Sequence, residues 1–169
     1  YGVGCFFFGN DCIYFKRIDT SYYYKADLEL NYEEELDSSA LGVFDGKHIY
    51  GNKMSKVGET TVYEGLFKEN IETGEYELLY AGEGNLRCEI LYISEDSIYF
   101  TRNDGEGPSG AYQRLYRIQK SGGEPELIFD DASTDIYELR QTNAGLFASV
   151  QKYDENGDGD AFCARVITD

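Results

Sequence analysis

Short apolar segments separated by turn residues run along the whole chain. In the clearest of them, such as 26–30 (Ala-Asp-Leu-Glu-Leu), apolar and polar positions alternate. No long segment shows the i, i+3, i+4 spacing of apolar residues that a packed helix needs. Glycine, asparagine and aspartate stand between the segments, where tight turns favour them. The pattern predicts β-strands joined by tight turns, with helix almost absent.

One strand recurs along the chain, each time after an apolar strand and a tight turn, which predicts a series of hairpins. Its copies are 12–15, 48–50, 97–100 and, more weakly, 146–148. A further strand follows each hairpin, at 26–30, 65–69, 114–118 and 161–165. An outer strand is visible only in the two middle repeats, at 75–79 and 125–129.

Four-stranded antiparallel units that repeat at roughly 40 to 50 residues are typical of propeller blades. The sequence therefore predicts a single all-β domain over 1–169, a β-propeller or a propeller fragment of about four blades. Its repeats are approximately 1–39, 40–84, 85–132 and 133–169. The last blade is predicted to lack its outer strand. Three alternatives follow for closing the ring. The N-terminal residues supply the missing strand of a four-bladed ring, the chain continues into a larger propeller, or another chain completes the ring. Because open edges attract strands, we expect self-association or a continuation of the chain.

The third repeat is the most regular. It contains an Ile-Tyr-Phe-Thr-Arg strand at 98–102 and a Leu-Tyr-Arg-Ile strand at 115–118. A Ser-Gly-Gly turn at 121–123 and a Glu-Leu-Ile strand at 126–128 follow. This order resembles the repeats of YWTD-type (low-density-lipoprotein-receptor-related) propellers and, since tryptophan is absent, more closely those of their bacterial relatives of unknown function. The resemblance implies a propeller scaffold, and it transfers no catalytic residue to this chain.

The net charge limits the partners that we expect. The chain has 32 acidic and 15 basic residues, a formal charge of −17. Nucleic acid is not an expected partner, because no stripe of Lys and Arg overcomes this charge. No apolar run approaches the roughly 20 residues that a transmembrane helix needs, so we expect no membrane-spanning segment.

The four cysteines form no Cys-x-x-Cys pair, and they stand at Cys5, Cys12, Cys88 and Cys163. The only histidine is His48, so a zinc site is not expected. With Gly9 and Asn10 as a two-residue turn, Cys12 would face Phe7, and a Cys5–Cys12 bridge would need another register. The cysteines are either apolar packing residues or include at least one disulfide.

One loop of the last repeat carries oxygen ligands at alternate positions, namely Asp154, Asn156, Asp158 and Asp160. With glycines between them, this spacing matches the first half of a calcium loop. An EF-hand is excluded, because Phe162 and Arg165 stand at later ligand positions. The loop therefore predicts either a structural calcium site with a ligand from elsewhere or a solvated hairpin loop.

A second candidate for binding is the run Tyr22, Tyr23 and Tyr24 at the equivalent place in the first repeat. Tyrosine offers a large rigid face with a polar tip, so this run could bind a sugar or a peptide, or pack between blades. The acidic run 33–35 is interpreted as a solvated edge. A serine nucleophile would need a histidine as its base, but the sequence has no Gly-x-Ser-x-Gly motif to pair with His48.

No acid–base or nucleophile set is left once the strands are assigned, so we single out no catalytic residue. The sequence favours a non-catalytic propeller-type binding or scaffold module for a protein or glycan ligand, extracellular or at a bacterial cell surface. The alternative is the propeller part of a carbohydrate-active enzyme, or of a peptidase whose catalytic residues lie elsewhere. Two carboxylates about 5 to 10 Å apart in one pocket would favour a glycosidase.

Overall fold

The structure is a computed structural model of the 169-residue chain. It describes residues 3–8, 12–17, 23–31, 33–36, 42–58, 60–82, 88–103, 113–159 and 163–167. The described residues form fifteen β-strands and no helix, so the all-β prediction is confirmed. With no helix in this part of the chain, none is long and apolar enough to cross a membrane.

The strands form four antiparallel sheets, and in each sheet neighbours in the chain are neighbours in space. The first sheet contains β1 (Val3–Phe8), β2 (Cys12–Arg17), β3 (Tyr23–Asp27) and β4 (Glu33–Leu36). The second contains β5 (Gly42–Phe44), β6 (His48–Val57), β7 (Thr60–Asn70) and β8 (Tyr76–Ala81). The third contains β9 (Cys88–Ile93), β10 (Ser97–Asn103), β11 (Gln113–Gln119) and β12 (Glu126–Phe129). The fourth contains β13 (Thr134–Thr142), β14 (Gly145–Lys152) and β15 (Cys163–Ile167).

Alternation along the central strands explains why each sheet packs on both sides. Successive side chains of a strand point to opposite faces. In β10, Ile98 and Phe100 pack toward the second sheet, while Tyr99 packs toward the fourth. In β6, Ile49 packs toward the first sheet and Tyr50 toward the third. The Ile-Tyr pair that recurs in the sequence thus supplies one side chain to each of two neighbouring interfaces.

Three apolar clusters join consecutive sheets. Between the second and third sheets lie Tyr50, Leu66, Leu79, Cys88, Ile98, Phe100, Tyr116 and Ile118. Between the third and fourth lie Tyr99, Leu115, Ile136, Leu139, Leu146, Ala148 and Val150. Between the first and second lie Tyr14, Phe44, Ile49, Phe67 and Ile71. Burial of these side chains is the main force that holds the sheets together.

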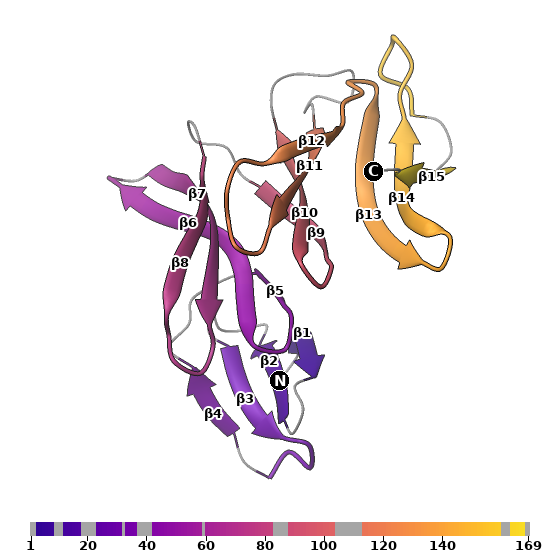
Figure 1. The fold of residues 1–169 in the computed structure, drawn as a ribbon. Helices are drawn as coiled ribbons and strands as arrows, with labels where there is room; N and C mark the ends of the chain where they lie inside the picture. Colours follow the sequence, from indigo (N-terminus) through magenta and orange to yellow (C-terminus); the bar gives the residue numbers. More distant parts are fainter. Residues whose placement is uncertain are drawn as a thin grey trace.

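The sheets follow one another in an open array, and the first and fourth lie at its two ends (Figure 1). A closed four-bladed ring is therefore not what the structure shows. The described part of the fourth sheet has three strands, as expected from the missing outer strand.

The register of the first hairpin corrects the sequence-based expectation. Phe7 pairs with Tyr14 rather than with Cys12, and Phe8 pairs with Ile13. Four residues therefore connect the pair, not two. The expected and the observed registers differ by two residues and leave every side chain on the same face of the sheet, so the alternation of apolar positions does not distinguish them. Cys12 and Cys88 form no disulfide in the described part of the chain, and Cys88 is buried in an inter-sheet cluster.

Candidate functional site

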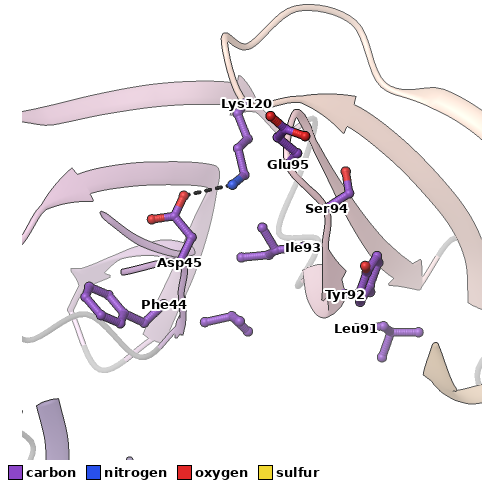
Figure 2. A pocket seen from close by; sticks show the side chains of 9 residues that line it. Phe44, Asp45, Leu91, Tyr92, Ile93, Ser94, Glu95 and Lys120 are labelled. Atoms are coloured by element: carbon purple, nitrogen blue, oxygen red, sulfur yellow. Dashed lines mark hydrogen bonds and ion pairs between the residues drawn. The ribbon is translucent and has the colours of Figure 1, made fainter. Parts of the chain in front are cut away.

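A pocket of about 560 Å³ lies between the second and third sheets. Its lining comes from β5, β9 and three turns, and consists of Val43, Phe44, Asp45, Leu91, Tyr92, Ile93, Ser94, Glu95 and Lys120. Figure 2 shows Asp45 and Lys120 on one side of the pocket and Leu91, Tyr92, Ser94 and Glu95 on the other, with Ile93 between them. Because β5 and β9 are the first strands of consecutive sheets, the pocket belongs to the junction of the two sheets.

The turn between β5 and β6 places Asp45 at this junction. The backbone N–H of Asp45 donates to the carbonyl of His48, at 3.1 Å. Asp45 Oδ1 in turn accepts hydrogen bonds from the backbone N–H groups of Lys47 and His48, at 3.1 and 2.9 Å. Gly46 has a φ of 101°, which glycine adopts without the steric cost of a side chain. The sequence Asp-Gly therefore forms a turn that fixes one oxygen of the carboxylate.

The second oxygen of Asp45 joins the two sheets. Oδ2 accepts hydrogen bonds from the Tyr50 hydroxyl at 2.7 Å and from Lys120 Nζ at 2.8 Å. The side chains of Lys120 and Asp45 are 19% and 17% exposed. The ammonium group of Lys120 also lies 5.3 Å from the centre of the Tyr50 ring, within the range of a cation–π contact. We call this set of Asp45, Tyr50 and Lys120 the junction triad.

The backbone of Lys120 is held on both sides. Its N–H donates to the carbonyl of Asp96 at 2.8 Å, within the third sheet. Its carbonyl accepts a hydrogen bond from Lys68 Nζ of β7 at 3.2 Å. Hydrogen bonds from both sheets therefore fix the backbone of Lys120, and its side chain extends to Asp45 of the second sheet.

Asp45, Tyr50 and His48 each keep one protonation state near neutral pH. Burial opposes ionisation of Asp45, but the hydrogen bonds from Lys120, Tyr50 and the two backbone amides outweigh it and hold the pKa of the carboxyl well below its usual range. Burial and the neighbouring Asp45 carboxylate raise the pKa of Tyr50. Burial lowers the pKa of His48, and nearby lysines lower it further against the pull of Asp45. At neutral pH Asp45 is therefore charged, and Tyr50 and His48 are neutral.

The other polar side chains that line the pocket differ in whether they already have hydrogen-bond partners. Ser94 Oγ accepts a hydrogen bond from the backbone N–H of Ser97 at 3.0 Å and lies 3.1 Å from an Asp96 oxygen. Glu95 is exposed, and it has no hydrogen-bond or ion-pair partner among the residues that the structure describes. Phe44 is buried and packs on Tyr14, with ring centres 4.6 Å apart. Glu95 is therefore the carboxylate that the pocket leaves for a ligand.

Asp45 and Tyr50 are poorly suited to proton transfer near neutral pH. A general acid must carry its proton near the working pH, and Asp45 is ionised far below it. Tyr50 holds its proton far above neutral pH. Neither group can exchange a proton efficiently with a ligand at neutral pH.

The loop predicted to bind calcium forms a closed turn around Asp154. Oδ1 of Asp154 accepts hydrogen bonds from the backbone N–H groups of Asn156 and Asp158, at 2.8 and 2.9 Å. These hydrogen bonds lower the pKa of Asp154. Asp160 lies outside the described residues. Within the described ranges no three His, Cys, Asp or Glu side chains are grouped as a metal site, and calcium binding here stays a prediction.

The predicted tyrosine platform is placed only at Tyr24. This side chain is buried and stacks on Phe15, with ring centres 5.6 Å apart. It therefore packs within the first sheet, and both alternatives for the tyrosine run, ligand binding and packing between blades, stay predictions. Tyr22 and the side chain of Tyr23 lie outside the described residues.

The junction triad was not predicted from the sequence, although the repeat contains a signal for it. Lys120 and Ile71 occupy equivalent positions in consecutive repeats, after the third strand of each, as Leu115 and Leu66 do within that strand. Ile71 packs in the cluster with Tyr14 of the first sheet, as Lys120 packs on Tyr50 of the second. A lysine stands at a repeat position that is otherwise apolar, and an aspartate precedes the tyrosine in a turn of the previous repeat. This pattern is a signal for an ion pair between the two sheets.

No protein-family model and no curated protein matches the sequence. Nine solved chains have a similar chain path, and two of them illustrate the likeness. One is the computationally designed Ika4 protein, with a TM-score of 0.45 and 12% identity, covering 99% of this chain and 92% of that one. The other comes from a structural and mechanistic analysis of two prolyl endopeptidases, with a TM-score of 0.48 and 15% identity, covering 92% of this chain. The match spans 26% of the peptidase chain, and neither likeness assigns a function.

Proposed function

We propose that the chain is a non-catalytic, propeller-type binding or scaffold module, and that the pocket between β5 and β9 binds its protein or glycan ligand. The observation that supports this most is the pocket itself. Its volume of about 560 Å³ lies within the usual range of ligand sites, roughly 300 to 1,000 Å³. Ligand sites combine apolar walls with a few placed polar groups, and this pocket contains residues of both kinds.

The fixed junction triad supports a binding role over a catalytic one. Asp45 and Lys120 neutralise each other, and their ion pair joins the two sheets whose strands line the pocket. A site whose walls are fixed before the ligand arrives loses less conformational entropy on binding. The triad is therefore assigned the role of shaping the pocket.

The propeller assignment gives the pocket a place in the whole molecule. If the four sheets are blades, their first strands, β1, β5, β9 and β13, line the central channel, and the pocket opens at its wall. Further strands from a continuation of the chain or from a second copy would then close the ring. A location outside the cell or at a bacterial surface is proposed from the resemblance of the third repeat alone.

Blocking the pocket tests this function. Val43 lines the pocket, and Val43→Trp should fill much of it. Val57→Trp is the matched control, because Val57 is 66% exposed at the end of β6 and does not line the pocket. Purified wild type and both variants would be applied to arrays of peptides and of glycans.

We expect wild type and Val57→Trp to retain the same ligands, and Val43→Trp to lose them. Retention by all three proteins would place binding elsewhere and contradict the assignment of the pocket. Absence of any retained peptide or glycan would contradict the binding role, and cleavage of an arrayed compound would favour the enzyme alternative.

A further inference from the structure

The pocket has one uncommitted charge, and that charge is negative. Asp45 receives four hydrogen bonds, and the Lys120 ammonium is paired with it. Ser94 is engaged with Ser97 and Asp96. Glu95 alone combines exposure with the absence of a partner among the described residues. A ligand that satisfies this pocket must therefore bring a positive group to Glu95.

The remaining walls call for an apolar group beside that charge. Val43 of β5 and Leu91 and Ile93 of β9 line the pocket, and each is only partly buried. Covering such side chains removes apolar surface from water and favours binding. The ligand should thus combine a cation with an adjoining aliphatic side chain.

We infer that the pocket takes a basic peptide segment, with a lysine or arginine side chain against Glu95 and a neighbouring apolar side chain against Val43, Leu91 and Ile93. The inference rests on the proposed binding function and names its ligand class. The formal charge of −17 adds a long-range attraction that speeds the encounter with a basic partner.

A glycan fits these walls less well. Sugars stack on exposed aromatic faces, and Phe44 is buried against Tyr14. The ring of Tyr92 is partly covered by Tyr99, with ring centres 5.9 Å apart. An uncharged sugar would also leave Glu95 without a charged partner. Acidic glycans and nucleic acids would be repelled.

The test compares a capped Gly-Leu-Lys-Leu-Gly peptide with its twin in which norleucine replaces lysine. Both are titrated into ¹⁵N-labelled protein, and affinities are taken from amide chemical shifts. Glu95→Gln removes the proposed partner of the lysine. Glu155→Gln is the control, because it changes the net charge equally at an exposed position outside the pocket. 1,5-Diaminopentane, a free amine without the peptide, is titrated in parallel.

The lysine peptide should bind wild type and Glu155→Gln alike and should bind Glu95→Gln roughly two- to fivefold more weakly, the loss of about one exposed ion pair. The norleucine peptide should bind more weakly than the lysine peptide and should not distinguish the variants. Shifts should concentrate at residues 43–45 and 91–97. Diaminopentane should bind far more weakly than the peptide.

Four results would overturn the inference. Equal weakening by Glu95→Gln and Glu155→Gln would mean that only the overall charge attracts the peptide. Equal binding of diaminopentane would assign the site to a free amine. Failure of the lysine peptide, together with a glycan or neutral peptide whose binding Val43→Trp abolishes, would reject the basic ligand and keep the proposed function. If no probe binds and Val43→Trp alters no binding, both the basic-peptide inference and the proposed binding function are contradicted.

Discussion

Asp45 connects the second and third sheets through a single carboxylate. One oxygen holds the β5–β6 turn, and the other binds Tyr50 of the same sheet and Lys120 of the next. A largely buried charge stabilises a fold only when its hydrogen-bonding capacity is filled, and here each oxygen has two donors. The pocket wall and the sheet junction therefore depend on the same residue.

Replacing Asp45 by asparagine should lower the free energy of unfolding by about 2 kcal/mol near neutral pH, because Lys120 loses its counter-charge. The pKa of Asp45 is lowered in the folded state, so its stabilisation is complete above the unfolded value of 3.8 and is lost as the pH falls below it. Urea unfolding should show the difference between wild type and Asp45→Asn shrinking below about pH 4. A difference that stays constant with pH would contradict this role.

The loop around Asp154 gives a second prediction at this scale. If Asp154, Asn156, Asp158 and Asp160 hold calcium, millimolar Ca²⁺ should raise the melting temperature and a chelator should lower it, because a ligand of the folded state stabilises it. Asp158→Ala should remove that response. A melting curve that is the same in chelator and in calcium would leave the solvated hairpin loop, with its hydrogen bonds to Asp154, as the interpretation.

At the scale of single elements, the sequence predicted most strands because their apolar residues pack between sheets. Ile98 and Tyr99, for example, lie in two different inter-sheet clusters, and their strand was placed correctly. The strand β4 was missed, since its Glu-Glu-Glu-Leu sequence has no apolar alternation and its position at the sheet edge requires little burial. The strand expected at 26–30 is observed as Tyr23–Asp27, because Leu30 turns out of the strand with a φ of 59°.

The candidate site was less predictable than the strands. Asp45 and Lys120 are 75 residues apart, and their pairing depends on how two sheets pack. Local patterns identify turns such as Asp45-Gly46, but they do not show which distant turn will lie opposite. The register of β1 and β2 was wrong for a similar reason, since the length of a connection is decided by both strands together.

At Gly65 the strands β7 and β8 approach each other so closely that a side chain should destabilise their pairing. Gly65 lies within β7 with a φ of 135°, and a Cβ at this position would collide with the carbonyl oxygen of Tyr80 in β8. Gly65→Ala should therefore cost about 3 kcal/mol of unfolding free energy, through both strain and displacement of the backbone.

Gly46→Ala is the matched control, since Gly46 also has a positive φ but a Cβ there meets no atom within 4 Å. It should cost only about 1 kcal/mol. Chemical denaturation of the two variants measures the difference. Equal losses would show that β7 and β8 tolerate the side chain.

At the scale of the whole molecule, consecutive sheets are joined in the same way, by an apolar cluster to which the central strands of both sheets contribute. The array is open, with the first and fourth sheets at its ends (Figure 1). On β13 of the fourth sheet, Tyr137 is 50% exposed. An open end with exposed aromatic surface favours the packing of another sheet.

We therefore expect the 169-residue chain to self-associate. Light scattering over a tenfold range of concentration should give a mass that rises above 19.2 kDa. Tyr137→Glu should reduce the increase by placing a charge on the fourth sheet. A mass of 19.2 kDa at every concentration would contradict self-association.

Hydrogen exchange with a bound ligand tests the central claim, that the pocket between the second and third sheets is the binding site. The ligand would be a peptide or glycan retained on the arrays, and exchange would be followed by mass spectrometry with and without it. We predict slower exchange at 42–48, 91–97 and 119–122, which carry the pocket walls and the junction triad, and no change at 134–142 of the fourth sheet. Protection confined to the fourth sheet, or to the loop at 153–159, would contradict the account.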